Sequence, residues 1–243
     1  ALFQGQLAVV ARFSDKEMEA LFSKIDTRNK KGVLYTGISL KYFNKKAVHC
    51  PVIQTIPKHF GDPKIASAIK DLSLYTHLIF SSQVGVRIFF DALLYYRVPK
   101  QVLIKKKVIA VGLATAAELK RRGVKRVEVP KEATQEGIIE KLSLEDINKC
   151  YFLLLQSSQA RKMLAHFLIG KKIRHQVIFL YETIPKVPDP IPNLSEMGEI
   201  VFTSPSTVKN FFDFFKKVPN NTKLTAIGPV TKNALRDIMK VKV

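Results

Sequence analysis

Two phrases of this sequence each occur twice, in the same order. The segment 80–91, FSSQVGVRIFFD, returns at 202–213 as FTSPSTVKNFFD. The first copy is followed by AVGLAT at 110–115, and the second by AIGPVT at 226–231. In each phrase an apolar run typical of a strand leads through Gly, Ser or Thr into a stretch with helical spacing. The repetition predicts two related α/β half-domains.

Each phrase places hydroxyl groups where a strand ends and a helix begins. Ser82 and Ser204 are suited to cap a helix, because a serine oxygen accepts a hydrogen bond from an N–H of the first turn. The same hydroxyls and N–H groups can instead bind a carboxylate or phosphate, and open α/β sheets bind ligands at this edge. Thr115 and Thr231, in the two Gly-x-x-Thr phrases, are likewise either caps or ligand contacts. The residues leave both interpretations open.

Length and charge narrow the class of protein. A chain of 243 residues forms one large domain or two small ones. The net charge of +20 favours a strongly anionic ligand, although the lysines fall in short groups that are often only solvated helix faces. No apolar run approaches the ~18 residues that span a bilayer, and no signal peptide is visible. The isolated Cys50 and Cys150 indicate a reducing, cytoplasmic compartment.

Strands and helices alternate along most of the chain. Apolar runs of this kind are typical of a parallel sheet covered on both faces. Before them, 14–25 has a helical pattern that starts with a capping box, and residues 1–5 resemble part of a protease-site tag. Strands are expected at 32–37, 52–56, 77–80, 108–111, 127–129, 151–155, 177–183, 200–203 and 224–227, and helices at 65–74, 85–95, 115–122, 135–142, 159–168, 206–215 and 231–240.

Prolines divide the chain into domains. The segments 51–57 and 177–184 are strands with prolines at their ends, which suits connectors better than central strands. The block between them, 58–176, holds a full set of strands. The last block, 185–243, holds only two, so we expect the strand near Val33 to join it. The result is a discontinuous domain, 1–50 plus 185–243 with 1–32 as an extension, an inserted domain, and two connecting strands as a hinge.

Motifs for metal or nucleophile chemistry do not accompany the repeats. The five histidines lack metal-binding spacing, and the common phosphate-loop, dinucleotide and nucleophile-elbow motifs are missing. The two cysteines are more typical of ordinary buried residues. Tyr181 is the best-placed phenol, on a connecting strand that would face any cleft, with a packed strand aromatic as the plain alternative.

Seven short motifs occur in an order that is specific. From about Val33 to the C-terminus they read FSS…V, AVGxAT, VPxxATxEG, LLL, YET, FTSPS…V and AIGPxT. In this order they resemble the uroporphyrinogen-III synthase family. The resemblance implies two α/β domains with Rossmann- or flavodoxin-like parallel sheets, joined by a two-stranded β-ladder that serves as a hinge.

The resemblance also implies an activity and a site. That family cyclises hydroxymethylbilane to uroporphyrinogen III, with inversion of ring D and loss of water, and uses no cofactor and no metal. Its substrate is a polycarboxylate, which suits a charge of +20. Gly37 and Gln83 depart from the family pattern, where Arg and Pro are usual. The resemblance marks Tyr181 as the catalytic residue, a candidate proton donor, and assigns substrate contacts to Ser81, Ser82, Thr115, Thr203, Ser204, Gly228 and Thr231.

The expected protein is therefore a cytoplasmic, monomeric lyase of heme biosynthesis that acts on hydroxymethylbilane without nucleic acid or membrane. A non-catalytic, two-lobed anion-binding protein of the periplasmic type is the alternative, since it too has paired α/β domains. A basic nucleic-acid binder ranks third, because no recognition module or row of stacking aromatics is evident.

Overall fold

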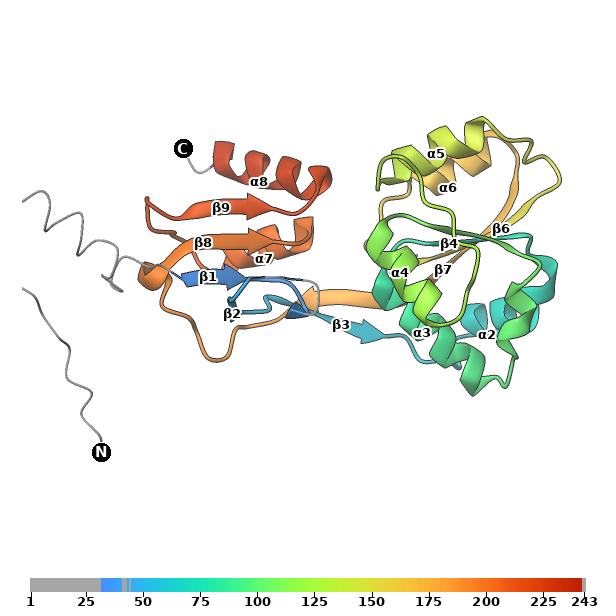
Figure 1. The fold of residues 1–243 in the computed structure, drawn as a ribbon, viewed down its shortest axis with the longest axis horizontal. Coiled ribbons are helices and arrows are strands. Elements are labelled where there is room, and N and C mark those ends of the chain that lie inside the picture. Colours follow the sequence, from blue (N-terminus) through green and yellow to red (C-terminus); the bar gives the residue numbers. More distant parts are fainter. Residues whose placement is uncertain (1–31, 41–42, 44, 242–243) are drawn as a thin grey trace, which may run out of the picture. The chain divides into compact units, whose positions relative to one another are not determined.

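The computed structural model describes residues 32–40, 43 and 45–241. The helix expected at 14–25 and the tag-like residues 1–5 lie outside them. The elements, shown in Figure 1, are β1 (Gly32–Tyr35), β2 (Val48–His49), β3 (Ile53–Pro57), α2 (Pro63–Lys70), η3 (Leu72–Leu74), β4 (His77–Phe80), α3 (Gln83–Tyr95), η4 (Lys100–Leu103), β5 (Lys107–Ala110), α4 (Leu113–Arg121), α5 (Gln135–Ser143), β6 (Tyr151–Ser157), α6 (Met163–Gly170), β7 (Arg174–Pro185), η5 (Leu194–Glu196), β8 (Met197–Phe202), α7 (Pro205–Phe214), β9 (Lys223–Ala226) and α8 (Pro229–Val241).

The chain divides into two compact units. Unit 1 comprises Ala1–Val52 and Val187–Val243, and unit 2 comprises Ile53–Lys186. The described part of unit 1 contains a parallel sheet with the strand order β2-β1-β8-β9. The sheet of unit 2 has the order β3-β7-β6-β4-β5, in which only the edge strand β3 runs antiparallel. The first strand does join the last two, as expected.

The inner strands β4 and β6 of unit 2 are buried on both faces, because most of their side chains are apolar on either face. Successive side chains of a strand point to opposite faces. Leu78 and Phe80 of β4 therefore pack with the helices α2, α3 and α4, whereas Ile79 packs with α5 and α6. Figure 1 shows these two helix layers on either side of the sheet.

The two repeated phrases fold into matching arrangements, one in each unit. Phe80 of β4 pairs with Ala110 of β5, and Phe202 of β8 pairs with Ala226 of β9 in the same register. Each Phe ring meets a Phe ring of the following helix edge-on, with centroids 5.2 Å apart in unit 2 and 5.3 Å apart in unit 1. The prediction of two related half-domains is confirmed at this level.

The units differ in the order in which the chain supplies equivalent strands. In unit 2 the chain makes β4 and β5 first and then β6 and β7. In unit 1, β8 and β9 occupy the places of β4 and β5, whereas β1 and β2, made at the start of the chain, occupy the places of β6 and β7. The two sheets thus share one strand order but are circular permutations of each other.

Three expected elements differ from the structure. The segment 127–129 forms only an isolated bridge between Ile109 and Glu128, because Pro130 follows and has no N–H to extend the pairing. The helix expected from residue 159 begins at Met163, since β6 continues as far as Ser157. The strand expected at 177–183 is longer, and β7 pairs with both β6 and β3.

The separate cores generate a prediction about stability. Phe80 and Phe202 are fully buried, and truncating such a ring to Ala costs about 3–5 kcal/mol. We expect Phe80→Ala to speed amide exchange in unit 2 and Phe202→Ala to speed it in unit 1, as measured by hydrogen–deuterium exchange. Leu144→Ala is the control, because Leu144 is 84 % exposed and its loss changes stability by less than about 0.5 kcal/mol. Equal loss of protection in both units from either Phe variant would contradict separate cores.

Candidate functional site

The strand order of unit 2 changes direction between β4 and β6. From β4 the chain continues outward to β5 and then returns to form β6 on the other side of β4. Open α/β sheets bind ligands at the carboxyl ends of strands beside such a switch point. Here both strands end in serines: Ser81 and Ser82 follow β4, and Ser157 and Ser158 lie at the end of β6.

A hydrogen bond joins Ser82 to Tyr181 at this edge of the sheet. The two hydroxyl oxygens are 2.7 Å apart. Ser82 Oγ also accepts the N–H of Gly85 at 3.0 Å and so caps α3. Tyr181 lies in β7, where it pairs with Ser157 of β6 and is only 6 % exposed. Hydroxyls from the neighbouring strands β4, β6 and β7 therefore meet at one place.

The surroundings of Tyr181 keep its proton in place. Burial raises the pKa of the phenol above its usual value, and hydrogen bonds with Ser82 and Ser157 lower it in part. The phenol is thus protonated at neutral pH and has a proton to donate, and in its contact with Ser82 either oxygen can be the donor. Each hydroxyl has one proton to donate, so a chain of hydroxyls leaves one proton at its end for a further acceptor. The arrangement is able to donate to a bound ligand.

Two further polar atoms at these strand ends lack a partner. The Ser158 Oγ and the Gln83 Oε1 are buried without a hydrogen bond among the described residues. An unsatisfied buried group costs about 1–3 kcal/mol, and such groups call for an explanation such as a ligand. The sequence predictions missed Ser157 and Ser158. The available signal was a Ser-Ser pair at the end of an apolar strand, the same pattern that had selected Ser81 and Ser82.

Unit 1 carries a corresponding set at the carboxyl end of β8. Ser204 Oγ accepts the N–H of Thr207 at 3.3 Å, and Thr207 Oγ1 accepts the N–H groups of Thr203 and Ser204 at 3.1 Å each. This reciprocal capping box starts α7. Ser82 and Ser204 have nearly identical backbone angles, so the capping interpretation is confirmed for both serines. Their role toward a ligand is a separate question.

The threonines of the two Gly-x-x-Thr phrases are not helix caps. The residue that caps α4 is Gly112, which has no side chain to bond the first turn, and Thr115 lies buried within that turn. Gly228 has a φ of +86°, which favours glycine, and Thr231 lies buried in the first turn of α8. Both phrases therefore leave first-turn N–H groups that no capping side chain satisfies, at the ends of β5 and β9.

The packing around Gly37 explains why glycine stands here in place of the Arg that is usual in the family. A Cβ at this position would lie 2.7 Å from Thr203 Cγ2 and 2.7 Å from the ring of Tyr35. The Gly37 carbonyl is also 2.8 Å from His49 Nε2. The end of β1 thus packs directly on the end of β8, and the space that an Arg side chain would need is filled.

The described residues contain no group of three His, Cys, Asp or Glu side chains that could bind a metal ion. None of their helices is long and apolar enough to cross a membrane.

Comparison with known proteins identifies relatives along most of the chain. The family model for uroporphyrinogen-III synthase HemD matches residues 40–241. The uroporphyrinogen-III synthase of Chlorobaculum parvum is 27% identical over 185 residues, which are 72% of this chain and 74% of that protein. The porphyrin biosynthesis protein HemD of Ruminiclostridium josui is 27% identical over 205 residues, which are 80% of this chain and 39% of that protein.

Solved structures show the same fold. A mutant uroporphyrinogen III synthase of the extremely thermophilic bacterium Thermus thermophilus matches with a TM-score of 0.58 and 18% identity over 84% of this chain and 88% of that chain. Uroporphyrinogen-III synthetase of Helicobacter pylori 26695 matches with a TM-score of 0.55 and 18% identity over 86% and 89%. The expected fold class, two α/β domains with parallel sheets, is confirmed.

The raised pKa of Tyr181 generates a prediction about pH. The unfolded chain loses this phenol proton at about pH 10, before the folded chain does. The stability that the neutral, buried phenol contributes is therefore present below about pH 10 and is lost as the pH rises through the folded pKa. We expect the difference in unfolding free energy between wild type and Tyr181→Phe, measured by urea denaturation, to be constant up to about pH 9 and to shrink above about pH 10. A difference that stays constant to about pH 11 would mean that the folded pKa is not raised.

Proposed function

The chain belongs to the uroporphyrinogen-III synthase family, and on this basis we propose that Ser82, Ser157 and Tyr181 form the catalytic end of its substrate site. The family catalyses the cyclisation of hydroxymethylbilane, so the enzyme is favoured over a non-catalytic anion-binding protein. The observation that carries the proposal is the 2.7 Å contact between Ser82 and Tyr181 at the switch point of unit 2.

The reaction limits what the protein must supply. The substrate loses its hydroxymethyl hydroxyl as water and becomes an azafulvene. Ring D then attacks through its substituted carbon to give a spiro intermediate, which fragments and closes again with ring D inverted. The pyrroles provide the electrons, so no strong protein nucleophile is required. The protein has to fold the chain, stabilise the cation and prevent simple head-to-tail closure, all of which positioning and electrostatics can do.

Tyr181 is suited to assist the first step. The departing hydroxyl needs a proton or a strong hydrogen bond as the C–O bond breaks, and a protonated phenol supplies one. The pKa of Tyr181 is raised by burial, which makes complete proton transfer harder. Its hydrogen bonds with Ser82 and Ser157 act the other way, because they favour the phenolate as it develops. We assign these two serines the role of tuning the donor.

The carboxylates of the substrate would bind at the helix starts. First-turn N–H groups and nearby hydroxyls bind anions, and both units have them at the carboxyl ends of their parallel strands. We propose contacts from Ser81, Ser82 and Thr115 in unit 2 and from Thr203, Ser204, Gly228 and Thr231 in unit 1. The net charge of +20 adds long-range attraction for a polycarboxylate.

We further propose that β3 and β7 act as a hinge. The two strands pair in an antiparallel ladder from Ile53↔Pro185 to Pro57↔Tyr181. The chain passes from one unit to the other only next to this ladder, after Val52 and after Lys186. We infer a cytoplasmic monomer that needs no nucleic acid, and the two free cysteines are in keeping with a reducing compartment.

One prediction concerns turnover. We expect Tyr181→Phe to lower the turnover of hydroxymethylbilane by about 10²-fold, near the lower end for acid–base assistance, because this substrate loses its hydroxyl readily. The assay separates the type I and type III products after oxidation. Tyr95→Phe is the matched control, since Tyr95 is 58 % exposed. Ser82→Ala combined with Tyr181→Phe should cost less than the sum of the single changes if the two hydroxyls act together. Wild-type turnover in Tyr181→Phe would exclude the donor role.

A second prediction concerns the two Gly-x-x-Thr phrases. If both units bind one substrate molecule, bound product should slow amide exchange at 112–116 and at 228–232 in the same complex. The measurement is hydrogen–deuterium exchange with and without product, with the amides around Leu144 as the internal reference. Protection confined to one unit would contradict a shared substrate and would place the site in that unit alone.

A further inference from the structure

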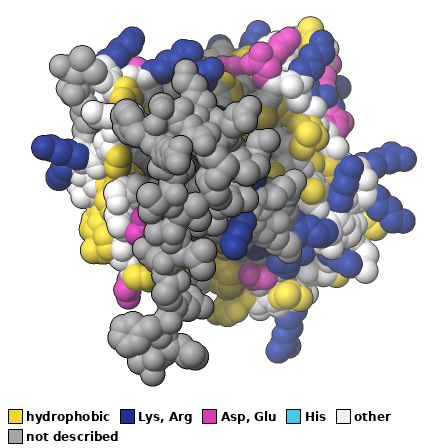
Figure 2. All heavy atoms as spheres, turned by 60° about the vertical axis from the view of Figure 1, so that its left-hand side comes forward, with side chains coloured by type: hydrophobic (Ala, Val, Ile, Leu, Met, Phe, Trp, Pro, Cys, Tyr) yellow, Lys and Arg dark blue, Asp and Glu magenta, His cyan; other side chains and the backbone are white. Residues whose placement is uncertain are grey.

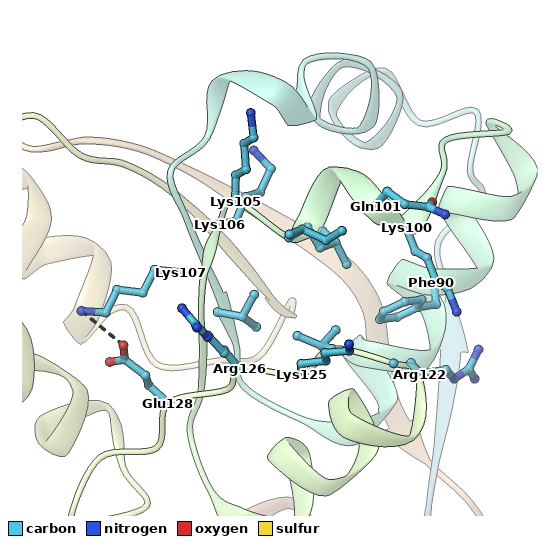
Figure 3. A pocket seen from close by; sticks show the side chains of 15 residues that line it. Phe90, Lys100, Gln101, Lys105, Lys106, Lys107, Arg122, Lys125, Arg126 and Glu128 are labelled. Carbon is cyan, nitrogen blue, oxygen red and sulfur yellow. Dashed lines mark ion pairs between the residues drawn. The ribbon is translucent and has the colours of Figure 1, made fainter.

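A basic pocket opens in unit 2 at the end of the sheet opposite to the serines (Figure 3). It has a volume of about 900 Å³. Its walls are η4, the segment 104–107 that leads into β5, and the segment 122–126 that follows α4. Lys107 is the first residue of β5, whereas Ser82 follows the last residue of the parallel strand β4. The pocket and the serines therefore lie at opposite ends of the same strands.

Positive charge dominates the lining of the pocket. Seven Lys and Arg residues face a single carboxylate, that of Glu128. Lys107 is the best neutralised of the seven, with its Nζ 2.7 Å from Glu145 and 3.4 Å from Glu128. Arg122 lies 3.6 Å from Glu118. These pairs neutralise two of the seven charges.

A third cation has a structural role. The ammonium group of Lys106 donates hydrogen bonds to the carbonyls of Ser73 and Tyr75. Burial lowers the pKa of this lysine. Lys106 therefore fixes the chain before β5 rather than offering its charge to a ligand.

Four cations remain without an ion pair among the described residues: Lys100, Lys105, Lys125 and Arg126. Figure 3 shows them on different sides of the pocket. All four are exposed, and like charges repel at ordinary ionic strength when they lie within about 8–10 Å of one another. An anion in the pocket would remove that repulsion.

The floor of the pocket is apolar. Phe90, Leu103, Val108 and Val124 line it and belong to the buried core of unit 2. Ile104 also lines the pocket, with 79 % of its surface exposed. A simple inorganic anion would not use these surfaces. They suit a ligand that has an apolar body as well as negative charge.

We propose that this basic pocket is a second ligand site, which binds an organic polyanion with an apolar body. Its volume lies within the range of about 300–1,000 Å³ that is usual for small-molecule sites. Nucleic acid is less well suited, because single strands stack their bases on successive aromatic side chains, and Phe90 is the one aromatic residue in the lining of the pocket. Further Lys and Arg side chains lie on the face drawn in Figure 2. The proposal depends on the pocket alone and is independent of the substrate site proposed above.

The test uses two soluble probes, uroporphyrin I as a polycarboxylate and ATP as a phosphate polyanion. The variant is Lys125→Gln with Arg126→Gln, both exposed residues of the pocket. The matched control is Lys64→Gln with Lys70→Gln, which removes the same charge from exposed positions of α2. Binding is measured by isothermal titration calorimetry at constant salt.

We expect the pocket variant to lose one equivalent of bound probe, or to bind it at least ~10-fold more weakly, while the control binds as wild type does. If the pocket variant loses binding of uroporphyrin I alone, the ligand of the pocket is a polycarboxylate. If it loses binding of both probes, the pocket accepts polyanions more widely. The midpoint temperature of thermal unfolding should be no lower in the pocket variant than in wild type, because the substitution removes like charges that repel each other. This comparison separates lost binding from lost structure.

Three results would overturn the proposal. Unchanged binding of both probes in the pocket variant would show that the pocket is not a site for them. Equal losses in the pocket variant and the control would show a response to total charge only. If neither small probe binds at the pocket but an acidic peptide, titrated as a third probe, does, the pocket is a docking surface for protein.

Discussion

The proposed substrate site depends on backbone N–H groups that a helix cannot pair internally. The fixed register of the parallel strands, with Phe80 opposite Ala110 and Phe202 opposite Ala226, brings successive helix starts to one edge of each sheet. Ser82 and Ser204 each accept a hydrogen bond from only one N–H group in the first turn of α3 and α7. No side chain caps α4. The topology therefore places groups suited to bind anions at these edges, which is where we propose that the substrate carboxylates bind.

The proposed catalytic end of the site needs few side-chain groups. Burial raises the pKa of Tyr181 and so keeps the phenol protonated, while its hydrogen bonds with Ser82 and Ser157 lower that pKa in part. A reaction whose electrons come from the substrate asks for no more than a donor and a fixed conformation. The same sheet that positions Ser82 and Ser157 also buries Tyr181, so packing and function depend on one set of strands.

Most of the fold could be predicted from patterns between residues close in the sequence. The features that were not predicted depend on contacts between residues far apart in the sequence. The apolar strands and the serine caps are visible within about ten residues, because strand and helix periods are short. The burial of Tyr181 depends on its register with Ser157, where the pairing of β6 and β7 shifts, and no local pattern reveals that. The basic pocket could not be predicted from the sequence for the same reason. Its two walls, 100–107 and 122–126, are separated by a strand and a helix, and each alone resembles a solvated lysine group.

The permuted strand order has a consequence for biosynthesis. Thr36, at the end of β1, bonds the carbonyl of Val201 in β8, a partner 165 residues later in the chain. At ~5–20 residues per second, roughly 10–30 s pass before that partner leaves the ribosome. Unit 2 is continuous in the chain and ends at Lys186, so all of it is made between Thr36 and Val201. The edge of β1 that pairs with β8 thus stays unpaired while unit 2 is made, and an unpaired strand edge is open to wrong partners.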